Sequence, residues 1–218
     1  MNLEKKIETI RLKIRRKYMH NTSNQRQKKI HVKDFTIISN NCWGGFIYQS
    51  YSLKYNSPTI GLFFVAEDYI KFISNFKNYI NMDLIEVNYK NSKWYDILKN
   101  NPSFGCYPIG KLGDIEIHFL HYKTFFEAKE KWNIRKSRIN FERIIFKFSE
   151  MNYCTEDDIK VFQNLPLENK ICFVTKKFKN LTNEYTFVVS NKKKLTASYE
   201  PFGNSKIIDI NDFINNLK

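Results

Sequence analysis

Short apolar runs alternate along the chain with stretches of helical spacing. The short runs predict strands at 34–39, 58–64, 83–89, 143–149, 169–175 and 184–190, and two more around a Gly110–Gly113 turn within 106–122. Apolar residues three and four positions apart predict helices over 44–55, 66–81, 124–138, 155–165 and 210–217. Thr155 and Asp158 have the spacing of a capping box at the start of one of these helices.

The fold class that follows is α/β. Strands separated by helices of this length are typical of a mostly parallel sheet with a helix layer on each face. We expect a three-layer Rossmann-like sandwich with a mostly parallel, partly mixed sheet, because the last two predicted strands have a short connection typical of an antiparallel edge. In such sheets ligands bind at the carboxyl ends of the strands.

The N-terminal arm has its own pattern. It carries an apolar stripe at helical spacing, formed by Leu3, Ile7, Ile10 and Ile14. Residues 1–33 hold eleven Lys and Arg against two Glu, a net charge of +9 out of +14 for the whole chain. Residues 20–29 are a polar stretch typical of a linker. We therefore expect a basic amphipathic helix and linker over 1–30 and a single α/β domain over 31–218.

A basic amphipathic helix has three uses. Residues 1–20 can lie on an anionic membrane surface, bind nucleic acid phosphates, or pack on the domain with a solvated basic face. The body of the chain lacks a nucleic acid recognition motif, so nucleic acid is the less favoured partner.

Targeting signals and cysteine spacing bear on the compartment. The chain has no run of eighteen apolar residues and no signal-peptide core, and its cysteines lack CxxC spacing. We expect a cytoplasmic protein, peripheral at the inner face of the cell membrane if the arm binds lipid.

The stretch SNNCWGG, residues 39–45, follows the first predicted strand. Its glycines permit close backbone approach, and amides at the start of the next helix favour negative charge. The residues assigned to substrate or anion binding are Ser39, Asn40, Asn41, Trp43, Gly44 and Gly45. Cys42 is a candidate nucleophile, because a helix N-terminus lowers a thiol pKa and the following amides offer an oxyanion hole. The alternatives are a small half-buried cysteine and glycines that serve helix packing.

The stretch EIHFLHY supplies two candidate bases, His118 and His121. Along an alternating strand His118 shares a face with Glu116, a suitable orienting carboxylate, and His121 ends the other face. A Cys42–histidine pair is the minimum equipment for acyl transfer through a thioester. The alternative is a core-edge histidine bonded to backbone. Two histidines three apart on a strand point to opposite faces, so we expect no metal site.

Arg135 and Arg138 end a predicted helix and are candidate anion ligands. Arginine binds phosphate or carboxylate in a bidentate way. The alternative is that these cations complement the dipole at the helix C-terminus.

Several stretches together resemble a known family. They are FTIISNNCWGGFIYQSYSLKYNSPTIGLFF, DYIKFISNFKNYI, YPIGKLGDIEIHFLHYKTFFEAKEKWNIRKSRIN and LENKICFVT. They resemble the bacterial domain-of-unknown-function family 1919 over roughly residues 30 to 218. Members of that family are often labelled exopolysaccharide biosynthesis proteins. The resemblance implies a three-layer α/β fold and work on surface or capsular polysaccharide, and it implies no catalytic residues.

The leading hypothesis is a transferase of surface polysaccharide assembly, with acyl transfer to a sugar hydroxyl favoured. In it Cys42 is the nucleophile or lines the acyl site, and His121 or His118 removes a proton. Arg135 and Arg138 bind an anionic donor. Acetyl-coenzyme A or a nucleotide-sugar is the expected class of donor, a glycan or lipid-linked saccharide is the expected acceptor, and we expect no tightly bound cofactor.

Two alternatives remain open. The first is glycosyl or glycosyl-phosphate transfer from a nucleotide-sugar, with Asp68 or Glu67 as the carboxylate, although no DxD pair is present. The second is a non-catalytic scaffold docked to the membrane by the arm. The oligomeric state does not follow from the sequence.

Overall fold

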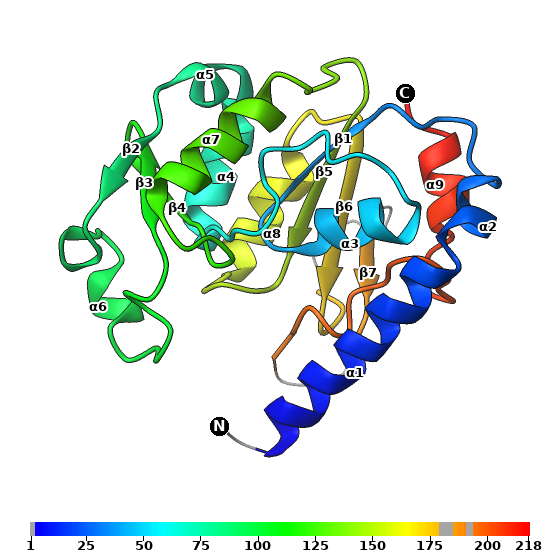
Figure 1. Ribbon diagram of the computed structural model, residues 1–218, viewed down its shortest axis with the longest axis horizontal. Coiled ribbons are helices and arrows are strands. Elements are labelled where there is room, and N and C mark those ends of the chain that lie inside the picture. Colours follow the sequence, from blue (N-terminus) through cyan, green and yellow to red (C-terminus); the bar gives the residue numbers. More distant parts are fainter. Residues whose placement is uncertain (1–2, 179–184, 191–193) are drawn as a thin grey trace.

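The computed structural model describes residues 3–178, 185–190 and 194–218. Its main sheet has four parallel strands in the order β1-β5-β6-β7 (Figure 1). These are β1 (Thr36–Ser39), β5 (Ile144–Ser149), β6 (Asn169–Val174) and β7 (Thr186–Val188). β1 pairs with β5 although more than a hundred residues separate them in the chain, so their carboxyl ends lie side by side.

Alternate residues of these strands enter two cores. On one face Ile37, Ile145 and Phe173 pack with α1 (Leu3–Asn21), α3 (Trp43–Ser50) and α9 (Ile210–Asn215). On the other face Ile38 and Phe148 pack with α4 (Ala66–Ser74), α7 (Phe125–Lys136) and α8 (Glu156–Asn164). The alternation is what a strand buried on both faces requires. The three layers confirm the expected α/β sandwich.

A second, antiparallel sheet lies to the left of the main sheet in Figure 1. It has the order β2-β3-β4, with β2 (Ile85–Val87), β3 (Ile109–Leu112) and β4 (Ile115–His118). The short helices near it are η1 (Tyr89–Asn91) and α6 (Tyr95–Leu98). The predicted hairpin is confirmed, but its turn is at Gly113 and Asp114, because Gly110 lies within β3 and pairs with Ile117.

Residues at the helix ends explain where two of the predicted helices begin or break. α8 begins with the predicted capping box, because Thr155 and Asp158 each accept the other's backbone amide. The predicted helix over 66–81 breaks at Asn75, whose φ of −135° and ψ of 48° are not helical. It becomes α4 and α5 (Phe76–Asn81).

The predicted strand over 58–64 is wrong. That segment forms only an isolated bridge between Phe63 and His118. Thr59 instead closes the outer edge of β1 with its side chain: Ser39 N donates to the Thr59 hydroxyl at 3.1 Å, and that hydroxyl donates to Ile37 O. A side chain thus replaces a neighbouring strand at the sheet edge.

Two further expectations are corrected. β7 pairs with β6 in parallel, so the last two strands do not form an antiparallel edge; residue 184, the first of that predicted strand, lies outside the described residues. The polar stretch 20–29 contains α2 (Ser23–Gln27). Its Arg26 is buried and donates to Ser50 O at 2.8 Å and to Met19 O, so this stretch packs against α3.

Candidate functional site

A cavity of about 590 Å³ lies where β1 and β5 end. We call it the strand-end cavity. Asn41 and Cys42 line it from the loop after β1, and 150–154 line it from the loop after β5. Its other walls come from residues between β1 and α7, such as Phe63 and Tyr107, and from 194–197. Its position is the one at which parallel α/β sheets bind ligands.

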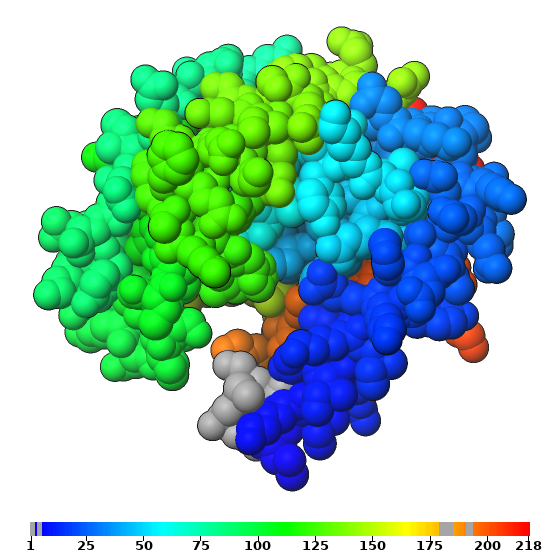
Figure 2. Space-filling view, in the orientation of Figure 1, coloured from blue at the N-terminus to red at the C-terminus, as the bar shows by residue number. Residues whose placement is uncertain are grey.

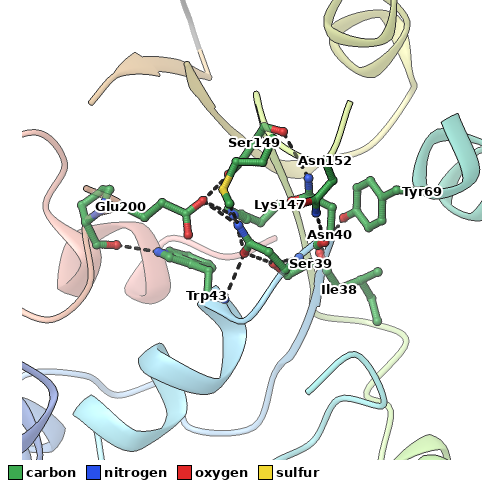
Figure 3. A network of polar contacts seen from close by, with 12 residues as sticks. Ile38, Ser39, Asn40, Trp43, Tyr69, Lys147, Ser149, Asn152 and Glu200 are labelled. Carbon is green, nitrogen blue, oxygen red and sulfur yellow. Dashed lines mark hydrogen bonds and ion pairs between the residues drawn. The ribbon is translucent and has the colours of Figure 1, made fainter. Parts of the chain in front are cut away.

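A buried polar network lies beside this cavity (Figure 3). Lys147 Nζ is 2.6 Å from Glu200 Oε1, and both side chains are fully buried. Asn41 joins them: its Oδ1 accepts from Lys147 Nζ at 2.8 Å, and its Nδ2 donates to Glu200 Oε1 at 2.9 Å. The Ser149 hydroxyl donates to the same Glu200 oxygen. The network thus connects the ends of β1 and β5 to the C-terminal segment.

Charge is held inside the protein by this network. Burial lowers the pKa of the Lys147 ammonium, and the Glu200 carboxylate opposes that shift. Among the described residues no partner is within hydrogen-bond distance of Glu200 Oε2. The sequence reasoning missed both residues. A lysine inside the apolar run RIIFKFS was the available signal, because a central parallel strand buries every side chain it carries.

Ser39 and Asn40 are buried and tie the loops together. The Ser39 hydroxyl donates to Asn41 Oδ1 at 3.2 Å. Asn40 Nδ2 donates to Ser149 O at 3.1 Å, and Asn40 O accepts from Asn152 Nδ2 at 3.2 Å. Ser39 and Asn40 therefore position the loops after β1 and β5. Asn41, the next residue, lies in the cavity wall.

The predicted amide cradle is wrong at two of its three positions. Trp43 N donates to Asn41 Oδ1 at 3.1 Å, and Gly45 N donates to Cys42 O at 3.1 Å. These amides are therefore satisfied within the protein. The Trp43 ring is buried, and its Nε1 donates to Pro201 O at 2.5 Å.

Gly44 and Gly45 allow α3 to pack closely on β1. A Cβ on Gly44 would lie 3.2 Å from Ile37 Cγ2, whereas a Cβ on Gly45 would meet Ile60 at 3.6 Å. Both residues are buried. Close packing, the alternative given for these glycines, accounts for them.

The expected activation of Cys42 is also wrong. The side chain is half-buried and lines the strand-end cavity as the N-cap residue of α3. Burial, followed by the nearby Glu200 carboxylate, raises the pKa of the Cys42 thiol to about 11. The Arg16 and Lys147 cations oppose this shift without overcoming it. The thiol therefore stays protonated near neutral pH, and a protonated thiol is a weak nucleophile.

His118 lies behind the cavity wall. Its ring is fully buried, stacks on Phe63 at 4.6 Å between centroids, and meets the edge of Tyr107 at 5.8 Å. Phe63 and Tyr107 line the cavity, and His118 does not. Burial lowers the pKa of the His118 imidazole to about 3, and neither ring nitrogen has a hydrogen-bond partner among the described residues.

Glu116 does not orient His118. It accepts from the Ser92 hydroxyl at 2.6 Å and from Lys93 N at 3.0 Å. Its carboxylate fixes the loop that follows η1.

His121 is exposed and held by its backbone, which donates to Gly61 O at 3.0 Å. Burial of part of its surface, and then the Arg16 cation, lowers the pKa of the His121 imidazole. His121 is not part of the strand-end cavity wall. In the described part of the chain no hydrogen bond joins the Cys42 thiol to the ring of His118 or His121, so the predicted pair is not assembled.

Arg135 and Arg138 line a different cavity, of about 600 Å³, which we call the basic cavity. Lys54 and Lys131 line it too, near the last turn of α3, whereas Cys42 lies at the first turn. Arg135 donates to the Tyr122 hydroxyl at 2.5 Å, and Arg138 contacts a backbone carbonyl at 3.5 Å. The predicted anion ligands therefore line a cavity whose wall does not include Cys42.

The carboxylates considered for glycosyl transfer lie elsewhere. Asp68 is fully buried and accepts from Lys93 Nζ at 2.5 Å and from Trp94 Nε1 at 2.6 Å. Glu67 is on the surface, 3.2 Å from Lys71 Nζ. Neither lines the strand-end cavity. Asp68 also accepts from Glu116 N of β4 at 2.9 Å, so it is a structural residue that joins α4 to the second sheet.

Neither a metal-binding cluster nor a membrane-spanning helix is present in the part of the chain that the structure describes. No cluster of three or more His, Cys, Asp or Glu side chains in that part of the chain is arranged to hold a metal ion. No described helix combines the length and apolarity needed to cross a membrane.

Comparison with known proteins places the chain among proteins of unknown function. The family model "Domain of unknown function (DUF1919)" matches residues 13–218. An uncharacterized protein of Haemophilus influenzae is 33% identical over 159 residues, which is 73% of this chain and 70% of that protein. The family match begins within α1 and includes the residues that line both cavities.

Proposed function

The chain belongs to the DUF1919 family, and we propose that it is a transferase of bacterial surface polysaccharide biosynthesis or modification. The observation that carries the proposal is the strand-end cavity, which lies where parallel sheets bind ligands and has a mixed aromatic and amide lining. Acyl transfer to a sugar hydroxyl is the favoured reaction.

The lining of the strand-end cavity suits a saccharide. Aromatic rings come from Phe63, Tyr107 and Tyr153, and amide groups come from Asn101 and Asn152. A sugar presents an apolar C–H face and a set of hydroxyl groups, which rings and amides match respectively. A volume of about 590 Å³ accommodates a small saccharide with the reacting end of a donor.

The reaction transfers an acyl group directly. The sugar hydroxyl oxygen attacks the carbonyl carbon of an acyl thioester such as acetyl-coenzyme A, and the C–S bond breaks. The hydroxyl proton passes to a base, and the thiolate leaving group takes up a proton. Glu150 is the carboxylate of the lining, held at its Oε2 by the Thr175 amide at 2.6 Å and the Thr175 hydroxyl at 2.8 Å. We assign Glu150 as the base that accepts the hydroxyl proton, in place of His121 or His118. In this reaction Cys42 lines the part of the cavity that holds the acyl group of the donor.

The basic cavity supplies the donor's anchor. Lys54, Lys131, Arg135 and Arg138 form a cationic lining suited to phosphate. Coenzyme A and nucleotide-sugars both carry phosphates, so this cavity also supports glycosyl or glycosyl-phosphate transfer as the second candidate. A lipid-linked acceptor in either reaction requires a position at the inner face of the cell membrane.

Thermal-shift measurements separate the two donors. Acetyl-coenzyme A is expected to raise the melting temperature of the wild-type protein. The rise should be smaller for an Arg135→Gln/Arg138→Gln variant. Stabilisation by nucleotide-sugars alone would favour the second candidate instead.

Acetyl transfer to the bacterial surface saccharide, followed by mass spectrometry, tests the assigned roles. Glu150→Gln should slow transfer by about 100-fold or more, because general base catalysis is typically worth that much. Cys42→Ala should slow it less than about tenfold. Glu156→Gln, an exposed acid on α8, is the matched control. Full activity of Glu150→Gln would overturn the assignment, and an acyl group trapped on Cys42 would restore the thioester route.

A further inference from the structure

The apolar stripe of α1 faces away from the protein. Its side chains have exposed fractions of 70% for Leu3, 40% for Ile7, 56% for Ile10, 65% for Ile14 and 57% for Tyr18. In an ordinary surface helix the apolar stripe faces the core. Here the helix presents that stripe to its surroundings along its whole length.

The opposite face of α1 fixes this orientation. The Arg15 guanidinium donates to the carbonyls of Ser198, Glu200 and Phe202 at 3.1–3.3 Å and lies 3.8 Å above the Phe202 ring. Arg16 donates to Gln49 Oε1 of α3 at 2.8 Å. These contacts span 33 or more positions of the chain, so tertiary packing, and not local propensity, leaves the apolar stripe outside.

Cations border the stripe on both sides. Residues of a helix are about 100° apart around its axis, which places Lys6, Lys13 and Lys17 along one edge of the stripe and Arg11 along the other. All four side chains are exposed. Glu8 lies on the packed side and accepts from the Tyr199 hydroxyl at 2.6 Å. The exposed face of α1 is thus an apolar strip with three lysines along one edge and one arginine along the other.

We propose that α1 docks the protein on an anionic lipid bilayer, lying flat with this stripe in the interfacial region. The apolar side chains enter the headgroup boundary and the flanking lysines contact lipid phosphates. A second copy of the chain would bring like charges together along the same contact. Nucleic acid phosphates would leave five apolar side chains unburied. An anionic membrane satisfies both parts of the surface.

Docking through α1 also sets the position of the strand-end cavity. The segment held by Arg15 continues from residues 194–197, which line that cavity. Figure 2 shows the surface hollowed between the green lobe and the orange segment, next to α1. The segment packed on α1 and the cavity wall are thus continuous, so a bilayer that holds α1 also fixes the position of the cavity relative to the membrane, which suits an acceptor carried on a lipid. This consequence rests on the proposed function, and the docking itself does not.

Vesicle flotation with the full-length chain tests the docking. The vesicles are phosphatidylcholine alone and phosphatidylcholine with phosphatidylglycerol. Ile10→Ser/Ile14→Ser should weaken binding to the anionic vesicles by about 100-fold, on the order of tenfold per buried side chain. Lys13→Gln/Lys17→Gln should weaken it by about fivefold per lysine. High salt should weaken binding of the wild type.

Matched controls lie on other surfaces. Ile97→Ser/Phe126→Ser removes two exposed apolar side chains outside α1, and Lys90→Gln/Lys129→Gln removes two exposed charges. Both should bind within twofold of wild type. Melting temperatures confirm that each variant is folded, which is expected because every substituted side chain is exposed.

Three results would overturn the docking: no binding to anionic vesicles, equal binding by the stripe variant, or a stripe-dependent dimer or RNA complex in its place. Transfer to a water-soluble acceptor without vesicles would be unaffected by the stripe variants. Failure of the docking is therefore distinguishable from failure of the proposed function.

Discussion

Lys147 is a charged side chain in the middle of a parallel sheet, and Glu200 is the partner that neutralises it there. The two are 53 positions apart. Asn41 and Cys42 were found from the sequence because small polar residues follow an apolar run at a strand end. Lys147, Glu200 and Glu150 were not, because no local pattern shows which distant side chain will share a buried position.

The buried pair predicts a coupled loss of stability. Lys147→Met leaves the Glu200 carboxylate buried without its cation, and Glu200→Gln leaves the ammonium without its anion. Each should lower the free energy of unfolding by about 3–5 kcal/mol, measured by urea denaturation. The double variant should lose clearly less than the sum of the two.

The control for this cycle is Lys99→Met, which breaks an exposed pair with Asp96 and should leave the urea midpoint unchanged. Additive losses in the double variant would mean that the two buried charges do not stabilise each other.

His118 predicts a specific response to acid. An unfolded histidine has a pKa of about 6.5, and the folded value is about 3. Between these two pH values His118 is therefore protonated in the unfolded chain and neutral in the folded protein. The stabilising contribution of neutral His118 is fully present above about pH 6.5. It falls by about 1.4 kcal/mol per pH unit as the pH drops towards 3.

The substitution His118→Phe isolates this contribution. The ring nitrogens make no hydrogen bond in the described part of the chain, so a phenyl ring can stack on Phe63 without loss. The variant should be as stable as wild type at pH 7 and more stable at pH 4.5, in urea titrations at both values. The exposed His31→Gln should follow wild type. Equal acid sensitivity of His118→Phe would contradict the buried neutral histidine.

At the scale of elements, several helices and the β3–β4 hairpin were predictable from local patterns, and the pairing of the other strands was not. α7 and α8 follow from periodicity and capping residues that lie within each segment. The apolar run 58–64 has the composition of a strand, yet its partners are side-chain contacts to β1. The parallel pairing of β6 and β7 depends on the path between them, and a short connection suggested the opposite direction. Pairing is set by the whole fold.

Gly44 and Gly45 test the packing of α3 on β1. Gly44→Ala would place a methyl group 3.2 Å from Ile37 Cγ2, which should destabilise the protein by about 1–3 kcal/mol. Gly45→Ala meets only ordinary contacts at 3.6 Å and should stabilise it by up to about 1 kcal/mol, because alanine is the better helix former. Urea denaturation of both variants gives the comparison. An equal effect of the two would exclude close packing as the role of Gly44.

At the scale of the whole molecule, the sequence identified the basic amphipathic arm without showing which way it faces. The apolar stripe alone predicts packing against the domain. Arg15 and Arg16 reverse this by binding carbonyl and amide oxygens far along the chain. The same contacts join α1 to the segment that carries Glu200 and to the cavity at the strand ends. The proposed lipid-binding helix and the proposed site are thus connected through one segment of the chain.

Transfer to the surface saccharide by a protein whose strand-end cavity is filled tests the proposed site most directly. Ala197 lines that cavity, and Ala197→Trp should lower the transfer rate by at least about tenfold by excluding the saccharide. Ser137→Trp, on the exposed end of α7, is the matched control and should transfer at the wild-type rate. We expect Ala197→Trp to lose transfer with an unchanged melting temperature, and undiminished transfer would show that the saccharide does not bind in the strand-end cavity.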